Sequence, residues 1–255
     1  MYKAISYTLI FLGIQLLVAS ITTFGMQLWG NEELSASPYV QLASMIVFSL
    51  LSALLFIRMK WAVPSRHYLL SRPWLTVFWA LMAAVGTIIP SIAVQEYLPT
   101  LPNLVETEMG AMMSAKGGYF VICLLVPLVE ELVFRGAVLR ALLSWKPEAR
   151  WGMIAVSALL FSIAHMNPAQ MPHAFLVGLL LGWMYCRTSS IVPGVAFHWA
   201  NNTISYFLFK LYPNTDTKLV DVLGSPQHVA LAVCFSLFIL LPALYQLHLW
   251  MRKAQ

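Results

Sequence analysis

The sequence predicts an all-α integral membrane protein, a bundle of about eight transmembrane helices with both termini on the cytoplasmic side. The first observation behind this prediction is the composition, because 60% of the 255 residues are hydrophobic and only 10% are charged. A typical globular domain carries about 25% charged residues. The second is a series of long apolar segments, and the third is the position of the charges between them. A chain with so few polar groups cannot cover a surface in water, so the lipid bilayer is its expected surroundings.

The predicted spans are apolar segments that end at charges, prolines or glycines. A bilayer-spanning helix needs about 20 mostly apolar residues, and the candidates are residues 5–29, 39–57, 74–94, 118–142, 151–166, 174–186, 191–211 and 229–250. The first segment is longer than the roughly 7–15 residues of a signal-peptide core, so we expect it to be retained. Residues 151–166 and 174–186 are short, which is consistent with tilted or re-entrant helices buried by their neighbours. Together the segments predict a single membrane domain, residues 1–255.

The charges between the spans predict the orientation. The second, fourth and sixth loops are basic and contain Arg58, Lys60, Arg66, Arg72, Arg140, Lys146, Arg150 and Arg187. The first and third loops are mainly acidic and contain Glu32, Glu33, Glu96, Glu106 and Glu108. Basic loops face the cytoplasm, and the tail residues Arg252 and Lys253 follow the same pattern. We therefore expect a multi-pass protein of the cytoplasmic membrane. The basic residues are spread over span ends, so the net charge of +5 does not indicate a nucleic-acid partner.

Two acidic residues interrupt the fourth apolar segment. Glu130 and Glu131 directly follow the apolar residues 124–129. A charge at the centre of a membrane helix costs about 2.5–3.5 kcal/mol, so each carboxylate needs a partner or a water-filled cavity. Arg135 lies four residues after Glu131, one turn along the same helix face, and can pair with it. Glu130 points about 100° away around the helix, which leaves it free to face a cavity.

Two later segments carry polar residues at one-turn spacing. Phe161 precedes His165 by four residues, and His198 precedes Asn202 by the same interval. Imidazole and amide groups in hydrocarbon must find hydrogen-bond partners, so three helices are expected to direct these groups into one shared cavity. The motif-bearing core would then comprise about residues 118–211. Each motif alone also fits a structural role, as a buried ion pair or a polar cross-link between helices.

In this order the motifs resemble those of a known family. Glu-Glu-x-x-x-Arg at 130–135, Phe-x-x-x-His at 161–165 and His-x-x-x-Asn at 198–202 are similar to the motifs of the CAAX prenyl endopeptidase and bacteriocin-processing family, called CPBP or Abi. The resemblance implies an intramembrane endopeptidase that hydrolyses peptide bonds of membrane-associated or lipidated proteins or peptides. It covers less than a third of the chain, and the sequence identifies no groove for a prenyl group.

The resemblance also implies a role for each motif residue. Glu130 would be the general base that activates water, assisted by His165. His198 and Asn202 would hydrogen-bond the oxyanion of the tetrahedral intermediate. The remaining motif residues are expected to support the site: Glu131, Arg135 and Phe161.

The sequence leaves the use of a metal open. His165, His198 and Glu130 would provide the three protein ligands of a catalytic zinc, with a fourth position for water. The family has been described both as metalloproteases and as metal-independent glutamate proteases. Because the chain lacks His-Glu-x-x-His, we favour a mechanism with no metal or other cofactor. A Gly-x-Ser-x-Gly elbow is also absent, which argues against a covalent serine intermediate.

Two other functions stay open. Intramembrane carboxylates and histidines also carry protons in transporters and relays, although the sequence shows no inverted repeat of the kind found in transporters. A binding or immunity protein with a degenerate site is the other alternative, and the complete set of motifs argues against it.

Overall fold

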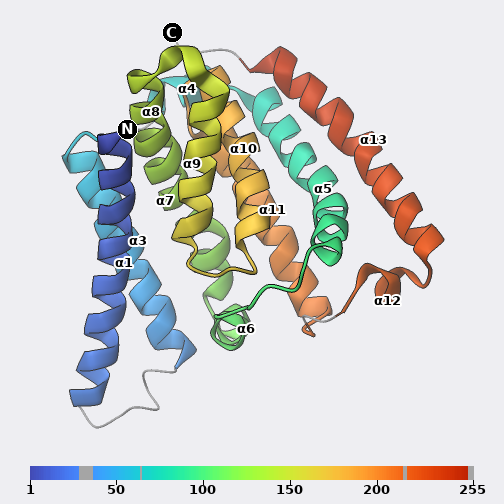
Figure 1. Ribbon diagram of the computed structural model, residues 1–255, viewed down its shortest axis with the longest axis horizontal. Coiled ribbons are helices and arrows are strands. Elements are labelled where there is room, and N and C mark those ends of the chain that lie inside the picture. Colours follow the sequence, from blue (N-terminus) through green and yellow to red (C-terminus); the bar gives the residue numbers. More distant parts are fainter. Residues whose placement is uncertain (29–36, 64, 215–216, 252–255) are drawn as a thin grey trace.

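The computed structural model describes residues 1–28, 37–63, 65–214 and 217–251, which form helices and connecting segments without any strand. The predicted all-α class is therefore confirmed for this part of the chain (Figure 1). Several charges used to predict the orientation lie outside the described residues, namely Glu32, Glu33, Arg252 and Lys253.

Every apolar segment of the sequence coincides with a helical segment. The long helices are α1 (Tyr2–Leu28), α3 (Pro38–Arg58), α5 (Trp74–Tyr97), α9 (Arg150–Ala164), α10 (Met171–Thr188), α11 (Val192–Leu211) and α13 (Pro226–Trp250). The fourth segment is one helical run made of η1 (Phe120–Leu125), α7 (Val126–Val133), η2 (Phe134–Leu139) and α8 (Arg140–Trp145). The connections contain the short helices α4 (Arg66–Leu70), α6 (Glu106–Ser114), η3 (Pro147–Ala149) and α12 (Leu219–Leu223).

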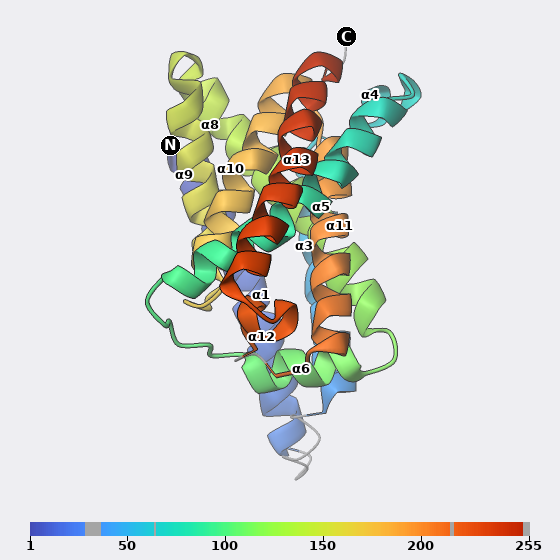
Figure 2. The same cartoon turned by 90° about the vertical axis from the view of Figure 1, so that its right-hand side faces the viewer.

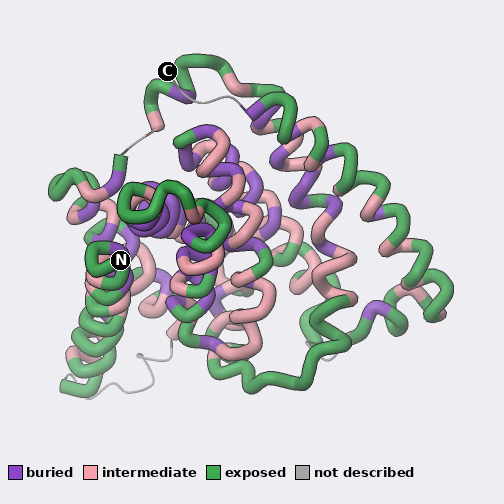
Figure 3. Tube along the Cα trace, turned by 45° about the horizontal axis from the view of Figure 1, so that its top comes forward, coloured by how far each residue is buried: buried purple, intermediate pink, exposed green. Residues whose placement is uncertain are grey.

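Helices α1, α3, α5 and α13 are long and apolar enough to cross a membrane. Their outer faces carry large exposed apolar side chains, such as Leu17 on α1 and Phe238 on α13, which is 75% exposed. Figure 3 shows this exposure along the outer helices and burial in the centre. Such faces fit hydrocarbon, and the chain is a membrane protein. The motif-bearing helices are shorter or more polar (α9 has only 15 residues), so eight crossings and cytoplasmic termini stay predictions.

The helical run from η1 to α8 lies at the centre of the molecule. All six residues of η2 are buried, and the Phe134 ring packs edge-on against Phe11 of α1 and Phe161 of α9, each at 5.3 Å between ring centroids. Beside it, α9 and α10 pack closely because Gly178 has no side chain: a Cβ there would lie 2.9 Å from the Cβ of Ala158. Helices α5 and α13 pack against each other on one side of this core (Figure 2).

Helix α7, which carries both glutamates, is flanked by the π-helical turns η1 and η2. Pro127 lies in the first turn of α7 and has no N–H to donate to the preceding turn. A widened turn before a proline is a common accommodation, and π-helical turns often occur at functional sites. The local geometry of α7 therefore departs from a regular α-helix at both of its ends.

Candidate active site

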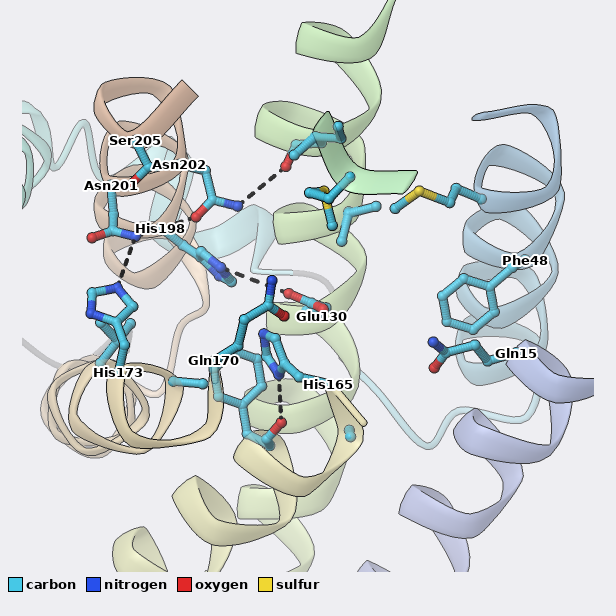
Figure 4. Close-up of a pocket in the computed structure, with 18 of the residues that line it drawn as sticks. Gln15, Phe48, Glu130, His165, Gln170, His173, His198, Asn201, Asn202 and Ser205 are labelled. Carbon is cyan, nitrogen blue, oxygen red and sulfur yellow. Dashed lines mark hydrogen bonds and ion pairs between the residues drawn. The ribbon is translucent and has the colours of Figure 1, made fainter. Parts of the chain in front are cut away.

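The predicted catalytic residues line one cavity of about 400 Å³. Glu130 of α7, His165 after α9, and His198 and Asn202 of α11 all contribute to its wall (Figure 4). The cavity continues past them between α1, α3 and α6, where its wall is mostly apolar. Its size suits a small-molecule or peptide group, because ligand pockets typically enclose about 300–1,000 Å³.

Behind this wall, Glu131 and Arg135 form a buried ion pair. The Nη1 of Arg135 donates to the Oε1 of Glu131 at 2.7 Å, and both side chains are almost completely buried. Arg135 also donates from Nη2 to the Gly178 carbonyl at 3.4 Å, and its guanidinium lies 4.2 Å from the centre of the Phe161 ring. The pairing expected from the four-residue spacing is therefore present, and three helices hold it in place.

The backbone of α11 approaches this pair at Gly194. A Cβ at Gly194 would lie 2.7 Å from the Oε2 of Glu131, an oxygen that has no hydrogen-bond partner among the described residues. Glycine therefore allows α11 to pack directly onto the carboxylate. This close approach brings His198, one turn further along α11, up to α7.

His198 lies between the two glutamates. Its Nδ1 is 3.3 Å from the Oε1 of Glu131, and its Nε2 is 3.7 Å from the Oε2 of Glu130. The Glu131 carboxylate, paired with Arg135, can only accept, so the proton of a neutral His198 is on Nδ1. Its Nε2 is then unprotonated and faces Glu130. The Glu130 side chain is 16% exposed, whereas that of Glu131 is fully buried, so the two carboxylates have the different surroundings that their helix phase predicts.

His165 has a defined tautomer as well. Its Nδ1 lies 2.9 Å from the Phe161 carbonyl oxygen, and a carbonyl can only accept, so Nδ1 carries the proton. In neutral His165 the Nε2 lone pair is therefore free to accept a hydrogen bond. Phe161 orients the ring, since the two rings meet edge to face at 4.8 Å, and Phe161 also packs edge-on against His198 at 5.8 Å.

Asn202 lines the cavity, but its amide group is used within the protein. Its Nδ2 donates to the Ile122 carbonyl in η1 at 3.2 Å, and its Oδ1 accepts from Nδ2 of Asn201 at 3.3 Å. Asn201 also lies 3.4 Å through Nδ2 from the Nε2 of His173. These bonds tie α11 to η1 and α10.

Other polar residues of the cavity wall were not predicted from the sequence. Gln170 and His173 at the start of α10 and Asn201 of α11 all line the cavity. A signal for them was present: Asn201 lies three residues after His198, and His173 three after Gln170, spacings that share a helix face. The turn that joins α9 to α10 determines where Gln170 points, and turn geometry is not evident from periodicity.

Whether His165, His198 and Glu130 bind zinc stays open. Within the described ranges, no group of three or more His, Cys, Asp or Glu side chains is arranged to hold a metal ion, and this includes His165, His198 and Glu130. The close neighbours of His198 are two carboxylates, which suits proton exchange among these groups.

A comparison with protein families finds a match over the segment that contains the predicted catalytic residues. Residues 114–204 match the model of the type II CAAX prenyl endopeptidase Rce1-like family. This segment is similar to that family, and we call it the Rce1-like segment. The Rce1-like segment runs from the end of α6 into α11 and contains all three motifs, so the resemblance to the CPBP family is confirmed there. No curated protein and no solved structure matches the chain. Because the members of this family are endopeptidases, the match supports the prediction that the chain is a membrane protease.

Proposed function

We propose that this protein is an intramembrane endopeptidase that hydrolyses peptide bonds of membrane-associated protein or peptide substrates. One observation carries the proposal: Glu130, His165, His198 and Asn202 all belong to the Rce1-like segment and line a single cavity. The exposed apolar faces of the outer helices make the lipid bilayer the surrounding partner, and the expected location is the cytoplasmic membrane.

In this mechanism Glu130 and His165 bind and activate one water molecule. The Glu130 carboxylate and the free Nε2 of His165 both accept hydrogen bonds, so a water between them donates both of its hydrogens. Its lone pair then points away from these two groups, towards a scissile carbonyl in the cavity. When the water attacks, its proton passes to Glu130 as general base.

His198 then carries this proton onward. Its Nε2 lies 3.7 Å from the Oε2 of Glu130, and its Nδ1 faces Glu131. The imidazolium that forms is stabilised by Glu131, whose position Arg135 maintains. It can donate to the oxyanion and then protonate the leaving amine. Asn202 is the second oxyanion donor that the family resemblance implies. One hydrogen of its Nδ2 bonds the Ile122 carbonyl, so the other hydrogen would serve the oxyanion.

The experiment that tests the function compares new protein N-termini in membranes containing the wild type or Glu130→Ala. We expect cleavage products that depend on Glu130, with a rate reduction of about 10² to 10⁴ if it is the general base. Peptides built around the cleavage sites then serve as fluorogenic substrates for the purified protein. If the wild type and Glu130→Ala membranes give the same set of N-termini, the protease proposal is wrong.

We favour a reaction that uses no metal, and chelation tests this. The purified protein should keep its activity after dialysis against a strong chelator, because Glu130 and His165 activate water without a Lewis acid. Peptide cleavage before and after dialysis, with and without added zinc, is the measurement. Loss of cleavage on chelation and recovery with zinc would replace this proposal by the zinc-dependent one.

A proton relay is the second candidate, favoured by the position of His198 between the carboxylates of Glu130 and Glu131. Such a chain of acid and imidazole groups also moves protons in transporters. Proteoliposomes loaded with a pH-sensitive dye distinguish the two functions. Proton flux that Glu130→Ala abolishes, together with no peptide cleavage, would establish the relay.

A further inference from the structure

Hydrolysis in this cavity requires an N–H group that can bind the oxyanion when the water attacks. In neutral His165 the Nδ1–H donates a hydrogen bond to the Phe161 carbonyl, and in neutral His198 the Nδ1–H donates a hydrogen bond to Glu131. Neither ring therefore offers an N–H to the substrate before proton transfer. Catalysis is most effective when donors are already oriented towards the position where charge develops, so the cavity should contain another donor.

The two asparagines of α11 use most of their donor hydrogens within the protein. The Nδ2 of Asn202 donates to the Ile122 carbonyl at 3.2 Å. The Nδ2 of Asn201 bonds both Asn202 and His173, which accounts for both of its hydrogens. The Asn201 nitrogen therefore has no hydrogen left for a substrate, and the Asn202 nitrogen has one.

Gln170 has a free carboxamide in the same cavity. Its side chain lines the cavity and forms no hydrogen bond with any residue that the structure describes, although Gln170 occupies the N-cap position of α10. In Figure 4 the side chain points into the cavity, towards Glu130 and His165. A half-buried amide without a partner, directed at the proposed water position, has both N–H groups available.

The backbone at Gln170 is held firmly. The Gln170 N–H donates to the Asn167 carbonyl at 3.0 Å, and the Gln170 carbonyl accepts from Ala174 at 2.9 Å. Asn167 is fully buried and bonds the segment before α6: its Oδ1 accepts from the Leu104 N–H at 3.0 Å, and its Nδ2 donates to Asn103 at 2.8 Å. The turn that follows His165 therefore presents Gln170 from a fixed position, as an oriented donor requires.

We propose that Gln170 is a catalytic residue whose side-chain N–H stabilises the oxyanion, an inference that rests on the proposed protease function. As the water oxygen bonds to the scissile carbon, its proton goes to Glu130 and the carbonyl π electrons move to the oxygen. The Gln170 Nε2–H binds that oxygen. On collapse the C–N bond breaks, and the proton transferred through His198 goes to the leaving amine. Gln170 itself exchanges no atom.

Two variants of Gln170 test this with the fluorogenic peptide that the wild type cleaves and Glu130→Ala does not. Gln170→Ala removes the amide, and Gln170→Glu keeps its shape but replaces the NH₂ donor by an acceptor. Loss of one oxyanion donor typically lowers kcat about 10²- to 10³-fold, and we expect this loss in both variants with KM little changed. Gln95→Ala, at an exposed position near the end of α5, is the matched control and should behave as the wild type.

A transition-state analogue separates oxyanion binding from a structural role. The same peptide with an aldehyde at the scissile position, whose hydrate resembles the intermediate, should lose affinity for Gln170→Glu in proportion to the fall in kcat/KM. If Gln170→Glu keeps wild-type kcat, or loses kcat without losing affinity for the aldehyde, the inference is wrong while the protease function stands. If the wild type cleaves nothing, the protease function fails and the role of Gln170 fails with it.

Discussion

At the scale of single residues, the two adjacent glutamates are separated by their surroundings. Glu131 is fully buried and paired with Arg135 at 2.7 Å, whereas Glu130 lines the cavity. His198 contacts both carboxylates, so its imidazole couples the protonation of one to the other. The proposed chemistry depends on this difference, because a general base must be free to bind water.

Replacement of Arg135 by alanine should reduce the amount of folded protein rather than only its turnover. The substitution leaves the buried Glu131 carboxylate without its cation, which typically costs about 3–5 kcal/mol. Thermal unfolding in detergent and the yield of folded protein measure the effect. Arg150→Ala, at an exposed position, is the control and should change neither. Wild-type yield and stability in Arg135→Ala would show that the ion pair contributes nothing to folding.

At the scale of helices, close packing decides where the catalytic side chains point. Gly178 lets α10 lie directly against Ala158 of α9, and Gly194 lets α11 lie against Glu131. Both contacts act on the helices that carry His165 and His198. Small residues at such crossings are the usual means by which membrane helices approach closely.

Gly178→Ala should therefore destabilise the protein and weaken its activity. The added methyl group would lie 2.9 Å from the Cβ of Ala158 and 3.0 Å from its Cα, so the helices must separate. Overpacking of this kind costs about 1–3 kcal/mol. Thermal unfolding measures it, with Gly152→Ala of α9 as the control, because a Cβ there meets nothing within 4 Å. The double variant Gly178→Ala, Ala158→Gly should recover part of the loss. Equal stability of the two single variants would contradict this view of the α9–α10 contact.

At the scale of the whole molecule, charge and position agree. Two basic regions lie at the upper end of the view in Figure 1, namely the start of α4 with Arg66 and the connection between α8 and α9. Helix α6, which begins with Glu106 and contains Glu108, lies at the lower end. The start of α1 and the end of α13 are both towards the upper end. This arrangement supports the predicted orientation, with the basic end in the cytoplasm.

The orientation can be tested with single cysteines in a variant that lacks Cys123, Cys186 and Cys234. A cysteine in place of Lys146, between α8 and α9, should react with a membrane-impermeant maleimide only after the cells are opened. A cysteine in place of Glu108, in α6, should react in intact cells, because the two positions are expected on opposite sides. Labelling of the Lys146 position in intact cells would overturn the predicted orientation.

Local geometry allowed much of this protein to be predicted from its sequence. The helices follow from long apolar segments, and the Glu131–Arg135 pair follows from a four-residue interval, because helix geometry alone brings such residues together. The motif order was sufficient to predict the family resemblance, which the Rce1-like match over residues 114–204 confirms.

Relations between helices were decided only by the tertiary structure. The position of His198 between two glutamates depends on how α11 packs against α7. The hydrogen bond from the Asn202 amide to the Ile122 carbonyl depends on the π-helical turn η1. Gln170 enters the cavity because the turn after His165 is held by Asn167. Apolar periodicity determines which residues form a helix, but helix rotation, close approach and turn shape depend on contacts between residues far apart in the chain.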